Sequence, residues 1–501
     1  MDPDECCDSG CVPCERDRDG VAPLDLENYI GGKFVSHSND DWLNVLEPAT
    51  GYRFARVPLS EPKDVDTAVA AARAAQPDWG ALSHAERADW LDRIADALEA
   101  KYEEIATLES QDTGKPISLA REVDAHRSVT NFRFFAGLIR EHVEEQFEMA
   151  DATNIVISKP VGVAALITPW NLPLYLLSWK VAPAIGMGNT VVCKPSELTP
   201  MTANLLMETL HEIGLPAGVV NLVHGSGEGA GAPLTSHPDV DLVSFTGGTA
   251  TGAKVAEAAA PQFKKLSLEL GGKNATIIFD DCDIEKTVNG VARAGFLNSG
   301  QVCLCGSRIL IQETIYDEFV GKFVDAVESM KIGDPSDEAT ELGALISAEH
   351  LEKVESYVAL ASEEGGTLLT GGNPAMAGEF EHGNWLAPTI IADLSTDSRC
   401  SREEIFGPVV TLHKFDSEDE AVAIANGTDY GLAGSVWTGD LAKGQRVAEK
   451  IHTGMVWVNT WLHRDLRVPF GGVKNSGVGR EGGRWSLGFF SEPLNICLKH
   501  D

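Results

Sequence analysis

The spacing of apolar residues along the chain changes near residue 160. Before it, apolar positions recur at helical spacing with acids and arginines between them, which predicts helices over residues 64–76, 84–110 and 118–143. After it, short apolar runs alternate with helical segments. Strands are predicted at 161–167, 190–193, 219–223, 240–245, 275–279 and 308–312, and helices at 200–213, 284–298 and 316–329. Uninterrupted apolar strands that alternate with helices are typical of buried parallel sheets, so the pattern predicts doubly wound α/β domains, with a boundary near Gly271–Gly272.

Residues 160–179 carry no charge and are long enough to be mistaken for a membrane span. Pro169 and Pro173 interrupt the stretch, and Trp170 and Asn171 lie near its middle. Because proline removes hydrogen bonds within a helix, a buried strand that runs into a functional loop fits the stretch better. We therefore expect no membrane partner.

The charge of the chain narrows its possible partners. Its 501 residues include 40 Lys and Arg against 75 Asp and Glu, a net charge of −35, and the acids are spread along the chain. Nucleic acids and anionic membrane surfaces need clustered cations, so neither is an expected partner. A dispersed acidic surface repels itself until salt screens it, which predicts a salt-adapted protein from a halophile. A merely acidic cytosolic protein is the alternative.

The ten cysteines fall into two groups. Four of them lie in residues 1–20, which lack apolar periodicity and are predicted to be a disordered acidic extension outside the fold. Within it, Cys11 and Cys14 have the spacing of metal ligands, although no second pair accompanies them, and a loose tail without metal is the alternative. The other cysteines are scattered and no secretory signal precedes them, so reduced thiols in the cytoplasm are expected.

Two loops after predicted strands carry groups suited to ligand binding. Thr168-Pro-Trp-Asn171 presents an Asn amide that can donate to an oxyanion, although Asn beside Pro is also a common turn residue. Residues 245–252 form a Gly-rich turn between strand and helix, where main-chain N–H groups can approach phosphate oxygens. The turn lacks the GxGxxG pattern, so a simple tight turn stays open as the alternative.

Two further segments carry groups suited to covalent chemistry. Glu269 ends an apolar strand, where partial burial would raise its pKa and suit it to general-base work. A surface-facing acid at a strand end is the alternative. Cys303 or Cys305, in Gly-Gln-Val-Cys-Leu-Cys after a helix, can be a nucleophile if its thiol is activated. A small buried hydrophobe is the alternative for either.

In their order and joint presence, these segments resemble the aldehyde dehydrogenase superfamily from about Leu26 to Lys499. The similar motifs are TPWNLPL, KPSELTP, FTGGTATG, LELGGKN, GQVC, EEIFGPV and PFGGVKNSGVGREGG. The resemblance implies that Cys303 attacks an aldehyde to form a thiohemiacetal and then a thioester. It also implies that Asn171 and the Cys303 main-chain N–H hold the oxyanion, and that Glu269 activates the hydrolytic water. Cys305 is then structural.

The resemblance further implies a nicotinamide dinucleotide cofactor. Lys194 and Glu197 match the residues that bind the adenosine ribose, and Glu197 would repel a 2′-phosphate, which favours NAD over NADP. Gly248 stands where many members of the family have Ser, so a side-chain contact to phosphate is lost there. The expected cofactor-binding residues are Thr168, Trp170, Lys194, Glu197, Gly227, Gly247, Gly248, Leu270, Glu404 and Phe406.

Within the superfamily, the segments around residues 171–180 and 461–466 are similar to the 2-hydroxymuconic and 2-aminomuconic semialdehyde dehydrogenases. Their substrates carry a carboxylate conjugated to the aldehyde, and Arg127 and Arg464 could bind it. Structural ion pairs, such as Arg464 with Asp465, are the alternative. Betaine aldehyde or simple aliphatic aldehydes remain alternative substrates. CoA-dependent acylation is disfavoured because Glu269 is present, and an inactive scaffold because Cys303, Asn171 and Glu269 are all present.

The resemblance also implies an aldehyde dehydrogenase-like fold of two α/β domains plus a small β oligomerisation arm, assembled as a homodimer or homotetramer. The expected division is an acidic extension at 1–20, an NAD-binding Rossmann-like domain at 21–140 and 160–271, an oligomerisation arm at 141–159 and 485–501, and a catalytic domain with the nucleophilic Cys at 272–484.

Overall fold

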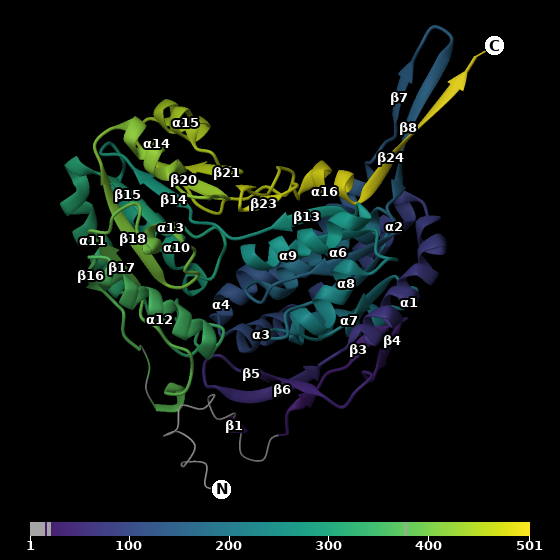
Figure 1. The fold of residues 1–501 in the computed structure, drawn as a ribbon, viewed down its shortest axis with the longest axis horizontal. Helices are drawn as coiled ribbons and strands as arrows, with labels where there is room; N and C mark the ends of the chain where they lie inside the picture. Colours follow the sequence, from purple (N-terminus) through teal and green to yellow (C-terminus); the bar gives the residue numbers. More distant parts are fainter. Residues whose placement is uncertain (1–15, 18–21, 375, 377, 501) are drawn as a thin grey trace.

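Two large sheets form the body of the protein (Figure 1). The computed structural model describes residues 16–17, 22–374, 376 and 378–500. The first sheet has the strand order β23 (Gly477–Val478), β13 (Lys265–Glu269), β12 (Leu242–Thr246), β9 (Val163–Ile167), β10 (Thr190–Lys194), β11 (Val220–Leu222), β3 (Asn28–Ile30) and β4 (Lys33–Val35). The five central strands run parallel, and β23, β3 and β4 pair antiparallel at the edges.

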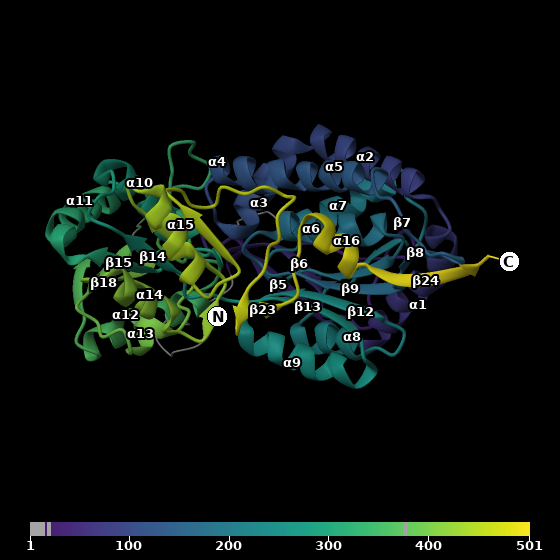
Figure 2. The same cartoon turned by 90° about the horizontal axis from the view of Figure 1, so that it is seen from above.

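Helices cover the first sheet on both faces, which explains why its central strands β9, β10 and β11 are buried at every position. In β9, which is apolar throughout, Ala164 and Leu166 pack into one core, whereas Val163, Ala165 and Ile167 pack into another. The helices of the first core are α2 (His84–Ala100), α5 (His126–Arg140), α6 (Pro173–Gly186) and α7 (Met201–Glu212), and those of the second are α1 (Pro62–Gly80), α8 (Ala232–Ser236) and α9 (Thr249–Ala259). The two layers of helices are visible from above in Figure 2.

The second sheet has the order β16 (Thr367–Thr370), β17 (Thr389–Ala392), β18 (Val409–Phe415), β15 (Arg308–Gln312), β14 (Ala275–Ile278), β20 (Ala433–Trp437) and β21 (Met455–Val458). Its pairs are parallel except β16 with β17. Ile309 and Ile311 pack toward α10 (Ile284–Phe296) and α11 (Tyr316–Glu328), while Leu310 packs toward α14 (Glu418–Asn426) and α15 (Leu441–Lys450). The predicted doubly wound α/β fold is confirmed.

Three smaller sheets complete the fold. β8 (Ala152–Pro160) pairs antiparallel with β7 (Glu145–Glu148) and β24 (Ser491–Lys499), and this sheet projects from the body (Figure 1). A four-stranded sheet contains β1 (Arg16–Asp17), β2 (Leu24–Asp25), β5 (Trp42–Leu46) and β6 (Tyr52–Pro58), and a two-stranded sheet contains β19 (Tyr430–Gly431) and β22 (Val473–Lys474). Except for β1, the predicted extension at 1–20 lies outside the described residues, including Cys11 and Cys14.

Two expected helices differ from the observed ones. The helix predicted over 84–110 is broken at Lys101, where the backbone leaves helical geometry and α3 (Tyr102–Thr113) begins. Apolar spacing alone does not predict such a break, because both helices bury apolar residues at helical spacing. The helix predicted over 118–143 is α4 (Ile117–Leu119), a π-helical segment η2 (Ala120–Ala125) and then α5.

The carboxyl ends of β9, β12 and β13 face the second sheet. Ligands bind at this edge of an open parallel sheet, at the point where the strand order turns back on itself. The chain passes from β13 to β14, and so from one sheet to the other, over residues 270–274. The uncharged stretch after Lys159 contains β9 and the first part of α6. Within the described part of the chain, no helix has the length and apolar character needed to span a membrane.

Candidate active site

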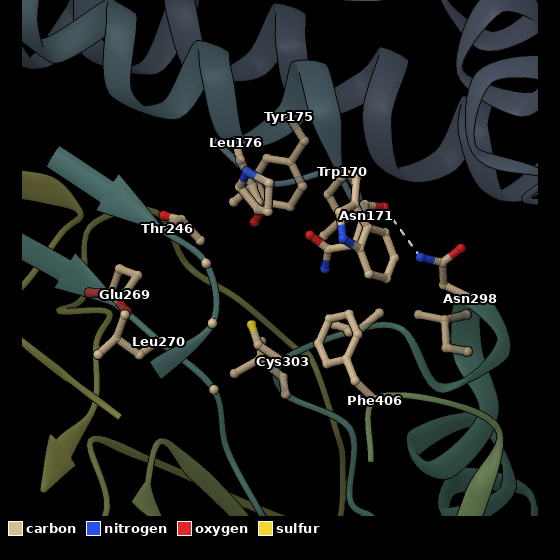
Figure 3. Close-up of a pocket in the computed structure, with 18 of the residues that line it drawn as sticks. Trp170, Asn171, Tyr175, Leu176, Thr246, Glu269, Leu270, Asn298, Cys303 and Phe406 are labelled. Carbon is tan, nitrogen blue, oxygen red and sulfur yellow. Dashed lines mark hydrogen bonds between the residues drawn. The ribbon is translucent and has the colours of Figure 1, made fainter. Parts of the chain in front are cut away.

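A cavity of about 280 Å³ lies between the two sheets. Ten of the predicted site residues line it: Trp170, Asn171, Gly247, Gly248, Glu269, Leu270, Cys303, Glu404, Phe406 and Arg464. The remaining predicted residues, which are Thr168, Lys194, Glu197, Gly227 and Arg127, are not part of its lining. Residues from five separate motifs of the sequence therefore converge on one cavity (Figure 3).

Cys303 follows a tight turn that only a few backbone conformations allow. Asn298, Ser299 and Gly300 all have positive φ angles, and a Cβ on Gly300 would lie 2.0 Å from the carbonyl oxygen of Gly407. Such backbone strain persists only where surrounding contacts enforce it, and it clusters at functional sites. The Asn274 amide nitrogen donates to the Cys303 carbonyl at 2.8 Å. The turn thus fixes Cys303 from both sides, with its sulfur directed into the cavity (Figure 3).

The Cys303 thiol is neutral in this environment. Burial raises its pKa well above the ordinary value, and the Glu404 and Glu269 carboxyls raise it further, while Arg464 acts in the opposite direction. A thiol is a weak nucleophile compared with its thiolate. Attack on a carbonyl therefore requires a base that removes the proton as the bond forms.

Asn171 lies at the end of the loop that follows β9. Its side-chain nitrogen donates to the main-chain carbonyl of Gln301 at 2.9 Å, two residues before Cys303. An amide nitrogen has two N–H groups, so the second can point into the cavity next to Cys303 (Figure 3). This arrangement provides a fixed donor for an oxyanion formed on a carbonyl that Cys303 attacks.

Glu269 ends β13 on the other side of Cys303. It is 4 % exposed, and neither carboxyl oxygen has a hydrogen-bond partner among the described residues. Burial raises its pKa well above the ordinary value, and Glu481 raises it further, against the influence of Lys180, Arg480 and Arg464. An unpartnered carboxyl with a raised pKa is suited to taking a proton from a water or a thiol.

A second group of predicted residues lies along the β10 and β12 ends of the first sheet. The Lys194 ammonium donates to the Glu197 carboxylate at 2.8 Å and to the Pro195 carbonyl at 3.1 Å. Gly248 is the N-cap of α9 and has no side chain to cap it, so the N–H groups of its first turn are available to an anion. A Cβ on Gly248 would meet no atom within 4 Å, whereas one on Gly247 would lie 2.5 Å from the Phe245 ring. This cradle has the donors and the free space that a dinucleotide phosphate requires.

Side chains from the loop before β18 and from the helix Ala348–Glu363 line the cavity between this cradle and Cys303. Glu404 accepts from the Gly272 N–H at 2.8 Å, and burial raises the pKa of its carboxyl. Phe406 has a positive φ, and its ring centre lies 5.3 Å from that of Trp170. The His350 Nε2–H donates to the Phe406 carbonyl at 2.7 Å. These residues form an apolar and carboxylate-bearing wall where the nicotinamide ribose is expected.

The two predicted substrate arginines both contact Tyr175. Arg464 lines the cavity, donates to the Tyr175 hydroxyl at 2.6 Å and lies 4.2 Å from the centre of the Phe470 ring. Arg127 lies 5.7 Å from the centre of the Tyr175 ring, and burial lowers its pKa. Within the described ranges neither arginine forms an ion pair, and Asp465 pairs with Arg467 instead of Arg464. The pairing of Arg464 with Asp465, considered above, is therefore not the observed one.

Several lining residues were not predicted. Tyr175 lies in the segment 171–180 and Phe470 in the motif PFGGVKNSGVGREGG, so the similarity of both segments to the family was available as a signal. Lys353 and His350 lie in α12 (Ala348–Glu363), a helix with ordinary amphipathic spacing and no unusual residue pattern. Their approach to the cavity depends on how α12 packs, which the sequence pattern does not register.

The comparisons with known proteins agree with this geometry. A family model described as "Aldehyde dehydrogenase family" matches residues 34–496. The chain is 48% identical over 482 residues to a 2-aminomuconic semialdehyde dehydrogenase of Bos taurus, covering 95% of this chain and 99% of the relative. It is 47% identical over 483 residues to a 2-hydroxymuconic semialdehyde dehydrogenase of Pseudomonas sp. strain CF600, with the same coverage.

A solved structure shows the same fold with a cofactor. The betaine aldehyde dehydrogenase of Staphylococcus aureus in complex with NAD+ superposes with a TM-score of 0.92 and 39% identity, covering 95% of each chain. The order of the two α/β sheets, the convergence of the motifs on one cavity and the match over almost the whole chain lead to one conclusion: this chain belongs to the aldehyde dehydrogenase family and is an oxidoreductase that acts on an aldehyde.

Proposed function

We propose that this protein oxidises the aldehyde of a carboxylate-bearing, muconic-type semialdehyde to an acid, with NAD as the electron acceptor. The observation that carries the substrate is Arg464, whose guanidinium lines the cavity without a carboxylate partner in the described part of the chain. A buried or half-buried guanidinium is stabilised by an anion, and it can bind a carboxylate through two parallel hydrogen bonds. Relatives of nearly 50% identity bear the names of muconic semialdehyde dehydrogenases, which supports the same assignment.

Arg127 adds to the positive potential at the same end of the cavity. It lies behind the Tyr175 ring, and the proximity of Arg464 is one cause of its lowered pKa. Two cations that contact one tyrosine attract an anionic substrate in a protein whose net charge is −35. Arg464 is proposed to bind the carboxylate directly, and Arg127 to act through Tyr175 and through its charge.

Betaine aldehyde is the less suitable substrate for this cavity. Its quaternary ammonium group needs carboxylates or a cage of aromatic rings free of cations. Aromatic rings are present, but Arg464 occupies the space over the Phe470 ring, at 4.2 Å from its centre. A cationic substrate would approach this guanidinium and be repelled, so an anionic aldehyde suits the cavity better.

The first half of the proposed reaction forms a covalent intermediate on Cys303. The Cys303 sulfur attacks the aldehyde carbon as the thiol proton passes to a water and on to solvent, so the unpartnered Glu269 carboxylate stays free to act as the base of the second half. The carbonyl electron pair moves onto oxygen, where the free Asn171 N–H and the Cys303 main-chain N–H hold the negative charge. Glu404 and Phe406 would hold the nicotinamide end of the cofactor, which would supply a hydride acceptor, and loss of the hydride would convert the thiohemiacetal into a thioester.

The second half releases the acid. Glu269 takes a proton from a water as the water oxygen attacks the thioester carbon. The carbon–sulfur bond then breaks, and its electron pair returns to Cys303 as a thiolate. The raised pKa of Glu269 suits it to this step because a carboxylate with a raised pKa is a stronger base than an ordinary one. Each proposed role thus falls on a side chain that faces the same cavity.

We propose NAD over NADP from the pair formed by Lys194 and Glu197. The Glu197 carboxylate lies 2.8 Å from the Lys194 ammonium and is one-third exposed, so it can accept from ribose hydroxyls. A 2′-phosphate at this place would meet the same carboxylate and be repelled.

The proposed cytoplasmic location is supported by the six cysteines within the described ranges, which are all free thiols.

We also propose a homo-oligomer that uses the sheet of β7, β8 and β24. This sheet projects away from the body, and it exposes Phe147, Leu494, Ile496 and Leu498, each by more than one-third. A strand pair that exposes apolar side chains is unfavourable in an isolated chain. Burial of this sheet against a second copy would remove these side chains from water.

The substrate proposal is tested by replacing Arg464 with alanine and comparing two aldehydes. We expect kcat/KM for an acidic semialdehyde to fall about tenfold to about a hundredfold, the loss of one charged hydrogen-bonding partner, and kcat/KM for a neutral aldehyde to change little. The control is Arg467→Ala, on the same loop, which removes an exposed pair with Asp465. Equal losses for both aldehydes in Arg464→Ala would contradict the proposal.

A further inference from the structure

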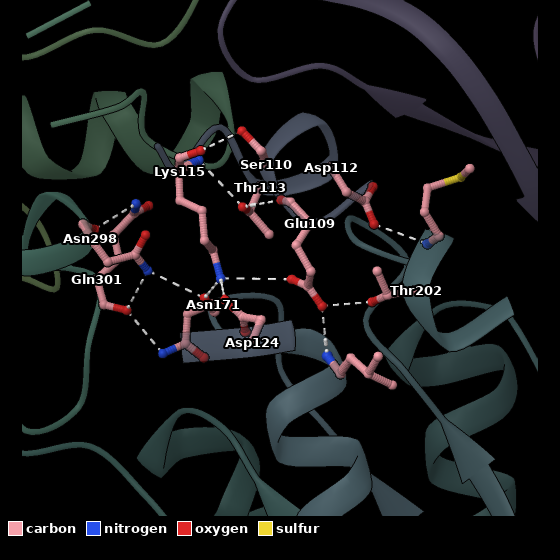
Figure 4. Close-up of polar contacts among 12 residues, drawn as sticks. Glu109, Ser110, Asp112, Thr113, Lys115, Asp124, Asn171, Thr202, Asn298 and Gln301 are labelled. Carbon is pink, nitrogen blue, oxygen red and sulfur yellow. Dashed lines mark hydrogen bonds and ion pairs between the residues drawn. The ribbon is translucent and has the colours of Figure 1, made fainter. Parts of the chain in front are cut away.

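A fully buried ammonium lies directly behind the Asn171 loop. The Lys115 side chain is 1 % exposed, and its Nζ donates to the Asp124 carboxylate at 2.6 Å (Figure 4). The same Nζ lies 3.7 Å from the Glu109 carboxylate and donates to the main-chain carbonyl of Asn171 at 3.1 Å. Lys115 therefore joins two buried acids to the backbone of the residue that the reaction needs as an oxyanion donor.

Glu109 holds the other side of the same loop. Its Oε1 accepts from the Leu174 N–H at 2.9 Å, in the first turn of α6, and from the Thr202 hydroxyl at 2.7 Å. The cluster thus contacts the loop twice, at the carbonyl of Asn171 and at the main-chain N–H of Leu174. Asn298, in the turn before Cys303, also donates to the Asn171 carbonyl, at 3.2 Å. Three side chains therefore restrain this backbone: Lys115 and Asn298 at Asn171, and Glu109 at Leu174.

The local structure of the cluster is specialised to bring these groups together. Lys115 follows Gly114, which ends α3 in the left-handed conformation. Asp124 lies in the π-helical segment η2, and such segments occur frequently at functional sites because an extra residue redirects the side chains. Leu119, just before this segment, and Val123, within it, line the cavity. The cluster is therefore directly behind one wall of the active site.

Stability alone does not account for this cluster. Burying an ammonium with two carboxylates costs desolvation energy, and apolar side chains of similar volume often stabilise a fold at least as well. Moreover, the Oδ1 of Asp124 has no hydrogen-bond partner among the described residues, and burial together with Glu109 raises the pKa of Asp124 to about 7. The cluster costs free energy to bury, and it contacts the active-site loop. We therefore expect that its role is to hold that loop in the geometry the reaction needs.

We propose that Lys115 is a positioning residue for the oxyanion site: its ammonium, held by Asp124 and Glu109, fixes the main-chain carbonyl of Asn171 and thereby directs the Asn171 amide toward the carbonyl that Cys303 attacks. This inference rests on the proposed function, because it requires Asn171 to stabilise the oxyanion. It concerns the rate of the chemical step and not the binding of the aldehyde or of NAD.

A double-mutant cycle between Lys115 and Asn171 tests the proposal. Lys115→Met is expected to lower kcat about tenfold to about a hundredfold, within the range of an oxyanion donor, with KM for aldehyde and Kd for NAD changed less than about threefold. In an Asn171→Ala background, the same Lys115→Met substitution is expected to lower kcat less than about twofold, because the group that Lys115 positions is already absent. The matched control is Lys264→Met, since Lys264 is also buried and also donates to a main-chain carbonyl, that of His237, away from the cavity.

Losses that multiply in the double variant would overturn the inference, since Lys115 would then act independently of Asn171. If Asn171→Ala leaves kcat unchanged, the oxyanion role itself is wrong, which is a different failure and is seen in the single variant. Should Lys115→Met not fold, Lys115→Met with Asp124→Asn removes both charges of the pair, and the same cycle is measured with that variant. A double replacement with wild-type kcat would also overturn the inference.

Discussion

Arg464 donates to the hydroxyl of Tyr175 at 2.6 Å, while its sequence neighbour Asp465 pairs with Arg467. The hydroxyl accepts only part of the hydrogen-bonding capacity of the guanidinium, so the remaining N–H groups can bind a ligand. Tyr175 thus orients Arg464 without neutralising it. This relationship is the structural basis of the proposed preference for an anionic aldehyde.

Tyr175→Phe is expected to weaken the binding of acidic substrates only. The ring and its contacts with Arg127 remain, but Arg464 loses the acceptor that fixes its orientation. Loss of one hydrogen bond to a charged group corresponds to about a threefold to about a tenfold rise in KM. Steady-state kinetics with an acidic semialdehyde and a neutral aldehyde measure it. A matching rise for the neutral aldehyde would show that Tyr175 has a general packing role.

Glu269→Gln is expected to trap the acyl-enzyme. The thioester would still form, but its hydrolysis would lose the base, so one equivalent of NADH per active site should appear rapidly and turnover should then fall by about a hundredfold or more. Intact mass spectrometry of the quenched variant should show the acyl group, and peptide mapping should place it on Cys303. Absence of both the burst and the adduct would argue against Glu269 as the base for deacylation.

The rate is expected to rise with pH through the neutral range. Burial raises the pKa of Cys303 and of Glu269, so both groups hold their protons at pH values where the ordinary groups would begin to lose them. The reaction requires Cys303 to lose its proton and Glu269 to be a carboxylate, so each raised pKa shifts activity to higher pH.

This pH dependence can be separated into its two groups. The rate at which iodoacetamide alkylates Cys303 reports the thiol alone, and the release of acid from the thioester reports Glu269. Both are expected to increase with pH, and Glu269→Gln should remove the dependence of the second. A thiol reactivity that is constant between about pH 5 and about pH 8 would mean that Cys303 is already a thiolate.

The salt adaptation inferred from the sequence leads to a stability prediction. A net charge of −35 destabilises the folded state by self-repulsion, and added salt screens this repulsion. The Tm is expected to rise as KCl increases from about 0.1 M to about 2 M. Sucrose at matched viscosity serves as a control for effects unrelated to charge. A Tm that falls over this range would contradict the halophile hypothesis.

The sequence was most informative where a residue type and its neighbours form a motif. Asn171 and Cys303 follow a strand and a helix, Glu269 is the last residue of a strand, and all three lie beside Gly or Pro residues and line the cavity. The sequence was uninformative about Lys115, because a lysine in a short connection is usually exposed, and its burial depends on Asp124 in a π-helical turn that apolar spacing cannot predict.

Arg127 illustrates an intermediate case. The family resemblance indicated Arg127 as a substrate residue, and the structure places it beside Tyr175. Arg127 lies near the Tyr175 ring and is not part of the cavity wall. This placement results from side-chain packing in three dimensions. Packing of this kind depends on contacts between segments that are distant in the sequence.

The most direct measurement compares two aldehydes side by side in high salt, by the absorbance of the NADH formed. One substrate is 2-hydroxymuconic semialdehyde, which carries a carboxylate, and the other is betaine aldehyde, which carries a quaternary ammonium. We predict that kcat/KM for the muconic compound exceeds that for betaine aldehyde by about a hundredfold or more, as one charged interaction gained and one repelled would give. Equal values, or a preference for betaine aldehyde, would contradict a carboxylate-binding role for Arg464.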